Sequence, residues 1–368
     1  MRKLHFTIVA GARPNFVKVA SLINAVKAHP LWQQELFLHF VHTGQHHDPV
    51  LSGRFLEELH LPQPDVNLGS GSGTHAEQTG KVMVGFEKYL AAQQTDCVIV
   101  VGDVNSTLAC ALVAAKAGVA VAHVEAGLES GDRSMPEEIN RLATDAVSNF
   151  FFCTSRFAME NLVRRGHPKS SLFLVGNTMI DTLKANLDGS QPPTFWEKTK
   201  LQHRKFGVLT LHRPSNVDDA QNLSRFLLEL DRITPMPLVF PTHPRTRKML
   251  DSIRLETKNL IFVGPASYLE FVHLMKHCQV VLTDSGGIQE ETTYLSKPCI
   301  TLRENTERPE TVSVGSNVLV GQRLDLVNEL LQQVAQGQWK KCSLPELWDG
   351  QAGTRIVNHL VELLAQPG

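Results

Sequence analysis

The chain has 368 residues, of which 42% are apolar and 20% are charged, and its formal net charge is −1. This length exceeds one typical hydrophobic core, so the chain is expected to form two domains. A near-neutral chain has no electrostatic basis for binding nucleic acid or an anionic membrane, and we expect neither as a partner.

The N-terminus predicts a first strand and no secretory signal, because only a short apolar run lies between Arg2-Lys3 and Arg13-Pro14. No apolar stretch in the sequence is long enough to span a bilayer. The six cysteines form no CxxC pair, and most lie within apolar runs. We therefore expect buried thiols in a reducing cytoplasm, without a disulfide framework or a metal site.

The first half of the chain alternates strand patterns with helical patterns. Strands are predicted at residues 4–10, 36–41, 97–101, 119–124 and 150–153. Helices are predicted from Pro14, at 50–59, at 75–93, from about 105 to 117, from Pro136 and after Ser155, where the series is expected to close. Such alternation predicts a parallel sheet with right-handed crossovers.

Polar clusters follow several of these strands, at residues 43–48, 102–107 and 125–127. Parallel α/β sheets bind ligands beyond the carboxyl ends of their strands. A chance scatter of polar residues would not select those ends, so the pattern favours a functional role. The alternative is that these residues only cap helices or pair with arginines.

Residues 188–204 interrupt the alternation and are predicted to be a linker or surface loop, since they are polar and contain Gly189 and Pro192-Pro193. A second series of strands is predicted at 206–211, 238–240, 260–263, 279–282 and 299–302. The stretch 303–310 is highly charged and irregular, and it is expected to lie outside the core. A helix at 354–364 ends the chain.

The stretch TDSGGIQEE at 283–291 follows an apolar strand and starts a helix, which is the pattern of an anion site. Its Gly286-Gly287 turn would let the backbone approach a ligand, and the helix N-terminus favours phosphate. Ser285 can donate its hydroxyl, and Glu290-Glu291 can accept from sugar hydroxyls. The alternative is an ordinary helix cap at Asp284 or Ser285.

The two halves are predicted to be doubly wound domains whose strand ends face a common cleft. The second half offers cationic groups near the phosphate cradle at His212, Arg213, His243 and Arg308. The first half offers carboxylates at Asp103, Glu125, Glu137 and Glu138. Acid/base carboxylates combined with a phosphate site suggest chemistry on a nucleotide-linked substrate.

Taken together, these motifs resemble one family, the non-hydrolysing UDP-N-acetylglucosamine 2-epimerases. The similar segments run in order from Gly11 to about Gly321. They are GARP at 11–14 with Lys18, TGQH at 43–46, 102–107, HVEAGL at 123–128, PEE at 136–138 with NR at 140–141, VGNT at 175–178 with Ile180-Asp181, His212-Arg213, 284–291 and TERPE at 306–310. Each motif is weak alone, and their shared order makes the set specific.

The resemblance implies a glycosyltransferase-B-type fold: two Rossmann-like doubly wound α/β domains, a UDP-sugar in the cleft and no added cofactor. It divides the chain into an N-terminal domain with the acid/base carboxylates (1–188), a UDP-binding domain (189–352) and a final helix (353–368) that packs back on the first domain. A homodimer in the cytoplasm is also expected from the resemblance.

The resemblance also assigns roles by motif position. The catalytic residues would be Asp103, Glu125 and Glu137 as acid/base groups, with His212 beside the diphosphate. The substrate-binding residues would be Arg13, Lys18, His243, Phe271 (near the uracil), Ser285, Gly286, Gly287, Glu291, Arg213 and Arg308.

Elimination chemistry fits this assignment. The C2 proton of a UDP-N-acetylhexosamine is not adjacent to a carbonyl, so an enolate route is closed. A carboxylate can instead take that proton as UDP leaves C1, and re-addition with protonation on the other face inverts C2. The route needs carboxylates on two faces and cationic groups at the departing phosphate.

Several positions depart from the family pattern. Glu129 stands where the family usually has Arg, Asn149 where it often has Asp, and PSN at 214–216 where many members have Arg-Glu-Asn. Residues 69–80 are similar at least as much to relatives that act on diacetamido-uronic UDP-sugars. If Glu129 faces the cleft, its charge would disfavour an anionic sugar. Activation by a second UDP-sugar is not carried over, because these segments are altered.

Four hypotheses stay open. They are epimerisation of UDP-N-acetylglucosamine or a close relative such as a UDP-diacetamido-uronate, hydrolysis to UDP and free N-acetylmannosamine, glycosyl transfer, and catalytically silent binding of a UDP-sugar. A glycosyltransferase would use the UDP cradle but would leave the three carboxylate motifs unexplained. Epimerisation is therefore the favoured hypothesis.

Overall fold

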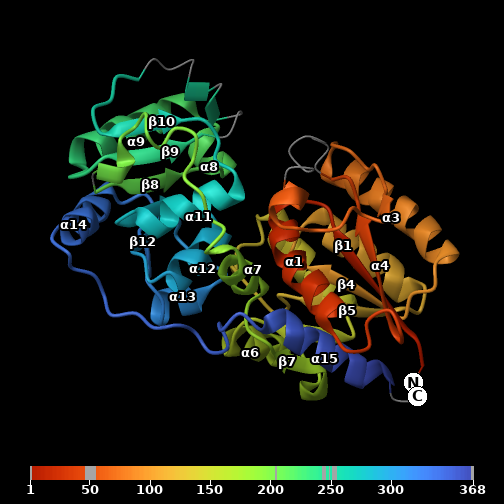
Figure 1. The fold of residues 1–368 in the computed structure, drawn as a ribbon. Coiled ribbons are helices and arrows are strands. Elements are labelled where there is room, and N and C mark those ends of the chain that lie inside the picture. Colours follow the sequence, from red (N-terminus) through yellow and green to blue (C-terminus); the bar gives the residue numbers. More distant parts are fainter. Residues whose placement is uncertain are drawn as a thin grey trace. The chain divides into compact units, whose positions relative to one another are not determined.

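The computed structural model describes residues 2–45, 55–203, 205–242, 246–247, 249–250 and 255–365, with only the backbone described for Arg13, Pro214 and Ser215. The chain forms two compact units (Figure 1). Unit 1 is Met1–Ala185 together with Glu346–Gly368, and unit 2 is Asn186–Pro345.

Unit 1 contains a seven-stranded sheet in the order β3-β2-β1-β4-β5-β6-β7, and its neighbouring strands pair in parallel. The strands are β1 (Leu4–Ala10), β2 (Leu36–His42), β3 (Val66–Asn67), β4 (Cys97–Val101), β5 (Ala120–Val124), β6 (Phe150–Cys153) and β7 (Leu172–Leu174). The helices are α1 (Arg13–Ala28), α3 (His75–Ala92), α4 (Asn105–Lys116), α5 (Pro136–Val147), α6 (Arg156–Arg164), α7 (Thr178–Asn186) and α15 (Ala352–Ala365), with a short 3₁₀ turn at Lys169–Ser171.

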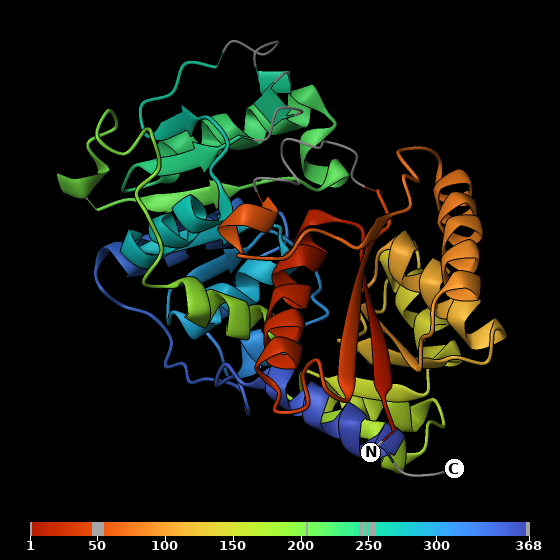
Figure 2. The same cartoon turned by 45° about the vertical axis from the view of Figure 1, so that its right-hand side comes forward.

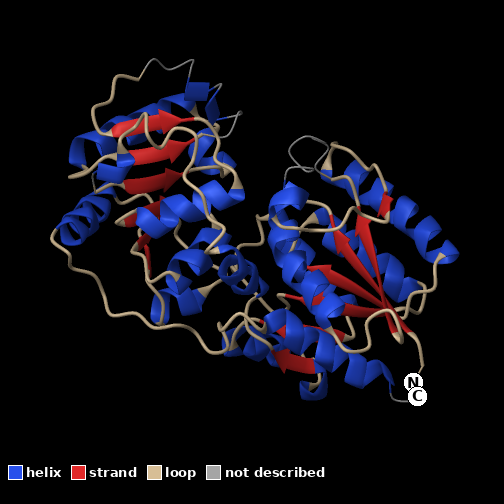
Figure 3. Ribbon diagram, in the orientation of Figure 1, coloured by secondary structure: helices blue, strands red, loops and turns tan. Residues whose placement is uncertain are grey.

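Helices cover both faces of this sheet (Figure 3). All five residues of β4 are buried, and its sequence is a continuous apolar run, as expected of a strand that is covered on both faces. Helix α3 begins at a capping box formed by Thr74 and Glu77, and it buries Val82 and Phe86. The packed sheet fixes where the loops after β4 and β5 begin.

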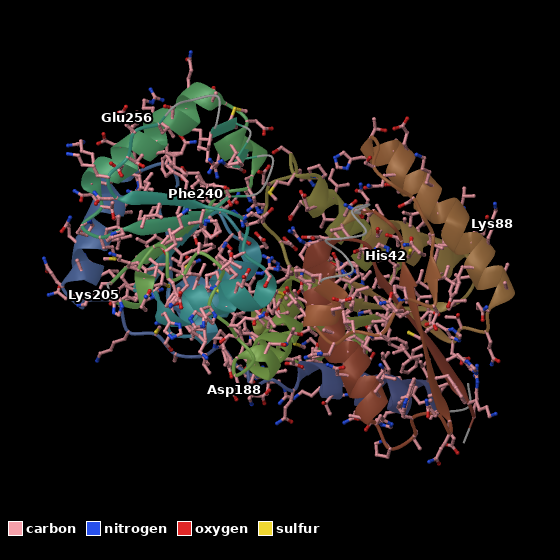
Figure 4. The ribbon with its side chains drawn as sticks, turned by 45° about the horizontal axis from the view of Figure 1, so that its top comes forward. His42, Lys88, Asp188, Lys205, Phe240 and Glu256 are labelled. Carbon is pink, nitrogen blue, oxygen red and sulfur yellow. The ribbon has the colours of Figure 1, made fainter. Side chains whose placement is uncertain are left out.

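Unit 2 has a six-stranded parallel sheet in the order β10-β9-β8-β11-β12-β13. The strands are β8 (Gly207–Thr210), β9 (Leu238–Pro241), β10 (Leu260–Val263), β11 (Val280–Thr283), β12 (Cys299–Thr301) and β13 (Asn317–Leu319). The helices are α8 (Pro214–Val217), α9 (Ala220–Ile233), α11 (Tyr268–His277), α12 (Gly286–Tyr294), α13 (Pro309–Ser313) and α14 (Leu324–Ala335), with a 3₁₀ turn at Leu201–His203. Phe240, labelled in Figure 4, lies in the apolar core of this unit.

The two parallel α/β sheets have the architecture predicted from the alternation of strands and helices. The strands β3, β7 and β13, of two or three residues each, were not predicted, whereas β12, also of three residues, was predicted at 299–302. The first series therefore does not close after Ser155, since β7 and α7 follow. The helix predicted at 50–59 lies partly outside the described residues, and 55–58 are helical.

The expectation that residues 303–310 lie outside the core is wrong. Arg303, Glu307 and Arg308 are 6%, 4% and 4% exposed. Arg303 Nη2 donates to Glu307 Oε2 at 2.7 Å, and Arg308 Nη1 lies 2.9 Å from Glu307 Oε1. Buried charges are tolerated where opposite charges and hydrogen bonds surround them, and a charged sequence alone does not distinguish that state from a solvated loop.

The segment after Pro345 returns to unit 1, where α15 packs against α1 (Figure 2). Trp348 is 2% exposed, and its Nε1 donates to the Thr154 carbonyl at 3.4 Å. The carboxylate of Asp181 accepts from the backbone N–H groups of Ala352 and Gly353 at 3.1 and 2.7 Å. A carboxylate at a helix N-terminus satisfies N–H groups that have no partner within the helix.

The predicted burial of the cysteines is confirmed for five of the six, and Cys342 is half-buried. In the part of the chain that the structure describes, no helix is long and apolar enough to cross a membrane.

Replacing Gly176 by Ala should destabilise unit 1 by about 2 kcal/mol or more. The alanine would be held in a left-handed backbone conformation, and its Cβ would overlap a neighbouring atom. Gly176 has φ +89°, and a Cβ there would lie 2.1 Å from the Leu347 carbonyl oxygen. Gly166→Ala is the matched control, since Gly166 has φ +90° and open space around it. Denaturant unfolding should show a clearly smaller loss for the control, and equal losses would contradict the role of the Leu347 contact.

Candidate active site

Several of the predicted functional residues follow the strands at which each sheet order reverses. In unit 1 that point lies between β1 and β4, and in unit 2 it lies between β8 and β11. Open α/β sheets bind ligands beyond the carboxyl ends of their strands at such a point. Asp103 follows β4, His212 follows β8 and Asp284 follows β11.

Asp103 is held by an arginine from α5. Its Oδ2 accepts from Arg141 Nε at 3.0 Å and lies 2.8 Å from Arg141 Nη2, so the guanidinium approaches it with two nitrogens. The side chain of Asp103 is 24% exposed, whereas that of Arg141 is 3% exposed. The buried cation thus fixes a carboxylate that stays accessible.

Glu125 lies in a strained turn after β5. Its φ is +67°, a left-handed value that costs a non-glycine residue about 1 to 3 kcal/mol and is found at sites where neighbouring groups enforce it. Its Oε2 accepts from Lys18 Nζ at 2.5 Å, and Glu125 is 2% exposed. Lys18, predicted to bind substrate, therefore lies against a predicted catalytic carboxylate.

The adjacent carboxylates Glu137 and Glu138 differ sharply. Glu138 is 2% exposed, and it accepts from the N–H and hydroxyl of Ser130, both at 2.9 Å, and pairs with Arg141. Glu137 is exposed in the first turn of α5. The structure thus gives Glu138 a structural role, and it leaves Glu137 open to a ligand.

The first three motifs of unit 1 meet at Gly11. A Cβ there would lie 2.2 Å from Thr43 Oγ1 and 2.3 Å from Ser106 Oγ, so only glycine fits. The two hydroxyls are 2.7 Å apart, and Gln45 Oε1 accepts from Ser106 Oγ at 2.7 Å. These residues hold the loops after β1, β2 and β4 together, and Thr43 and Gln45 are explained by packing as well as by function.

The carboxylate of Asp284 organises the strand ends of unit 2. It accepts from the N–H groups of His212 and Arg213, from Asn216 Nδ2 at 2.9 Å and from His212 Nδ1 at 2.8 Å. Burial raises the pKa of Asp284, but these hydrogen bonds outweigh burial and hold it below its ordinary value. Asp284 is fully buried, while the His212 side chain is 58% exposed and oriented by it.

The N-terminus of α12 differs from the predicted Gly-Gly turn, because Gly286 and Gly287 are its first two helical residues. A Cβ at Gly286 would lie 2.6 Å from Glu307 Oε1, so the glycine permits a close approach of protein groups. Ser285 occupies the N-cap position without a side-chain capping bond. Arg308, predicted to bind substrate, is 4% exposed and its Nε lies 2.7 Å from Glu290 Oε1.

Glu291 is 4% exposed, and its Oε1 accepts from the Tyr268 hydroxyl at 3.1 Å. Burial raises its pKa to about 8, and the neighbouring charge of Glu290 acts in the same direction. Phe271 lies one turn after Tyr268 on α11 and is half-buried. Phe271, predicted to lie near the uracil, and Glu291, predicted to bind the ribose, thus lie on α11 and α12. The Tyr268–Glu291 hydrogen bond joins these two helices.

The structure does not describe the side chains of two predicted substrate-binding residues, His243 and Arg13. His243 lies outside the described residues, and the side chain of Arg13 is not described, although its backbone begins α1. Arg213 is half-buried, and its Nε donates to the Asp284 carbonyl at 3.1 Å. No group of three or more potential metal ligands occurs among the described residues.

Comparison with known proteins supplies the decisive observation. The family model described as UDP-N-acetylglucosamine 2-epimerase matches residues 31–361. A UDP-N-acetylglucosamine 2-epimerase of Methanocaldococcus jannaschii is 40% identical, over 97% of this chain and 99% of the relative. The chain belongs to the UDP-N-acetylglucosamine 2-epimerase family.

Two further relatives extend this result. A UDP-2,3-diacetamido-2,3-dideoxy-D-glucuronate 2-epimerase of Pseudomonas aeruginosa is 37% identical, over 96% of this chain and 99% of the relative. A crystal structure of the M. jannaschii UDP-GlcNAc 2-epimerase in complex with UDP-GlcNAc and UDP has a TM-score of 0.85, at 40% identity and with coverage of 98% and 100%. The predicted family resemblance and the predicted glycosyltransferase-B-type fold class are both confirmed, and the family makes this chain an epimerase.

Glu129 departs from the family pattern, and the structure shows which residue compensates its negative charge. Its Oε1 lies 2.5 Å from Arg165 Nη2, at the end of α6. The charge of Glu129 is thus offset by a cation of the same unit. This pairing weakens the hypothesis that Glu129 repels an anionic sugar directly.

Sequence reasoning missed the groups that hold the predicted carboxylates. Arg141 was noted only as part of a motif, although its spacing of three residues after Glu138 on one helix face was a usable signal. The buried pair of His123 and Asp145, 2.7 Å apart, left no such signal, because the contact joins β5 to α5 across the fold.

The stability of unit 2 should depend on the ionisation of Glu291. Its folded pKa of about 8 lies above the ordinary value of 4.5, so its contribution to stability is complete below about pH 4.5 and is lost as the pH rises through 8. Glu291→Gln removes this titration, at about 1.4 kcal/mol per pKa unit. The melting temperature of the wild type should fall more than that of the variant between pH 5 and pH 9.

Glu256→Gln is the control for this measurement, because Glu256 is an exposed carboxylate of the same unit (Figure 4). Its pH profile should run parallel to that of the wild type. Parallel profiles for Glu291→Gln as well would show that Glu291 does not gain a proton on folding.

Proposed function

We propose that this chain catalyses non-hydrolysing epimerisation at C2 of a UDP-N-acetylhexosamine, UDP-GlcNAc to UDP-ManNAc or a close relative, by elimination and re-addition of UDP. The observation that carries the proposal is the pair of carboxylates Asp103 and Glu125. They follow β4 and β5, which are neighbouring strands in register at Val101 and Val124. Each is held by a cation, Asp103 by Arg141 and Glu125 by Lys18.

Unit 2 supplies the groups that suit a nucleoside diphosphate. The first N–H groups of α12 have no partner within the helix, and together with the positive end of the helix dipole they favour phosphate. We propose that Ser285, Gly286 and Gly287 bind the diphosphate, that Glu291 binds the ribose and that Phe271 lies beside the uracil. The further substrate-binding groups of the proposal are Arg13, Lys18, His243, Arg213 and Arg308.

The proposed reaction balances without an oxidant or an added cofactor. One carboxylate takes the C2 proton as the C1–O bond breaks, and UDP and 2-acetamidoglucal form in the site. UDP then adds back at C1 while a second acid protonates C2 from the other face, so the atoms of the substrate are restored with C2 inverted. His212, oriented by Asp284, offsets the charge that develops on the diphosphate.

The reaction run in D₂O should place one deuterium at C2 of the epimerised product, because the group that returns the proton exchanges with solvent. NMR of the products of UDP-GlcNAc tests the open hypotheses. Epimer with deuterium at C2 supports the proposal, whereas UDP with free N-acetylmannosamine indicates a hydrolysing enzyme. Epimer without deuterium at C2 would exclude elimination, and binding without any product would indicate a glycosyltransferase that lacks its acceptor or a silent sensor.

The variants Asp103→Asn, Glu125→Gln and Glu137→Gln keep the shape of each side chain but remove its acid/base capacity. Each should lower turnover by at least about 10²-fold while leaving calorimetric UDP affinity unchanged. Glu160→Gln, on the exposed side of α6, is the control and should keep wild-type turnover. Full activity in all three variants would refute the acid/base assignment.

A UDP-diacetamido-uronate is the second candidate substrate. It is favoured by the likeness to the P. aeruginosa enzyme of that specificity, and by the pairing of Glu129 with Arg165. The same NMR assay with both sugars decides between the candidates by their relative kcat/KM.

We also propose that the chain works as a homodimer in the cytoplasm. The reduced state of its six cysteines suits that compartment, where disulfides are rare. Light scattering of the purified chain tests the dimer, and a monomeric mass would contradict it.

A further inference from the structure

We propose that Asp145 and Arg165 are positioning residues, which fix the strained turn carrying Glu125, and that Glu129 acts on this turn through Arg165. The catalytic consequence rests on the proposed function, whereas the network itself is tested independently of activity. None of these three residues is among the acid/base groups of the proposed reaction.

The first step of the argument is the position of the Asp145 carboxylate around Glu125. Its Oδ1 lies 2.7 Å from Nδ1 of His123, two residues before Glu125. Its Oδ2 accepts from the N–H of Gly127, two residues after Glu125, at 3.3 Å. One buried carboxylate therefore holds both sides of the residue whose φ is +67°. A left-handed non-glycine residue persists only where such contacts over-determine it.

The second step connects this turn to Asp103. A carbonyl oxygen can only accept, so His123 Nε2 donates to the carbonyl of Gly102, at 2.9 Å, and Gly102 directly precedes Asp103. His123 and Asp145 are both fully buried, so water does not compete for these bonds. The network thus sets the end of β4 relative to the end of β5, and with it the two carboxylates of the proposed reaction.

The third step is the outer end of the network. Arg165 Nη1 donates to Asp145 Oδ2 at 2.9 Å, and its Nη2 lies 2.5 Å from Glu129 Oε1. The side chains of Arg165 and Glu129 are 23% and 27% exposed, whereas that of Asp145 is 1% exposed. Glu129 therefore holds a guanidinium that in turn holds the buried carboxylate. A substitution at Glu129 should change turnover without any contact between Glu129 and the sugar.

The first test replaces Asp145 by Asn, which keeps its size but cannot accept from all three donors. We expect kcat to fall at least about 10-fold, while KM and calorimetric UDP affinity stay within about 2-fold. Hydrogen exchange at the Gly127 amide should become at least about 10-fold faster. Asp181→Asn is the matched control, because Asp181 accepts from two backbone N–H groups in the same unit, at α15. It should keep the wild-type kcat and Gly127 exchange.

The second test is a double-mutant cycle of Glu129→Gln and Arg165→Met. Glu129→Gln alone should lower kcat about 3-fold, and it should have no further effect in the Arg165→Met background. Arg165→Lys keeps the charge and should recover part of the loss. If Asp145→Asn does not fold, Arg165→Met replaces it in the first test, because the Arg165 side chain is 23% exposed. The expected result is again a lower kcat with retained UDP affinity.

Either of two results in Asp145→Asn, or in Arg165→Met if it is used instead, would overturn the inference. One is a kcat equal to that of the wild type, and the other is unchanged hydrogen exchange at the Gly127 amide. Additive effects of Glu129→Gln and Arg165→Met would overturn the role of Glu129. A wild-type chain that does not epimerise UDP-sugars would refute the proposed function instead, and Gly127 exchange would still decide whether the network holds the turn.

Discussion

A carboxylate out of water is stable only where cations or hydrogen-bond donors surround it, and this constraint shapes the strand ends of both units. In unit 1, Asp145 joins β5, the turn after β5 and the end of α6, and Glu138 pairs with the arginine that holds Asp103. In unit 2, Asp284 gathers two backbone N–H groups and two side chains. Glu138 and Asp284 thereby fix the accessible side chains of Asp103 and His212, and Asp145 fixes the turn of the buried Glu125.

The sheets could be predicted from the sequence because β4 and β11 are long enough apolar runs, separated by helices of recognisable period. Parallel pairing with right-handed crossovers follows from this alternation without knowledge of side chains, whereas the order of the strands is known from the structure. The short strands β3 and β13 were not predicted because each has two or three residues that include an asparagine, which is rare in strands, whereas β12, also of three residues, was predicted from its apolar and β-branched residues.

The residues of the candidate site likewise divide into those that could be predicted from the sequence and those that could not. Asp103 and His212 were predicted because each lies within two residues of the end of a strand, which the sequence pattern indicates, whereas Asp284 was considered only as a helix cap. The contact of Asp103 with Arg141 joins the end of β4 to α5, and that of His123 with the Gly102 carbonyl joins β5 to the end of β4, so only the folded chain shows them. The charged stretch at Arg303 and Glu307 was misread for a related reason: one charge pattern suits both a solvated loop and a buried ion-pair cluster, and only packing decides.

The return of the chain to unit 1 has a consequence for synthesis on the ribosome. Unit 2 has all its residues once Pro345 has been added, whereas unit 1 still lacks Trp348 and α15 at that moment. The unit encoded first is therefore the last to be completed, and the faces of α1 and α7 that await the C-terminal segment stay uncovered during elongation. Nascent chains of this protein should therefore be most in need of chaperones after unit 2 has been made and before residues 346–365 have joined unit 1.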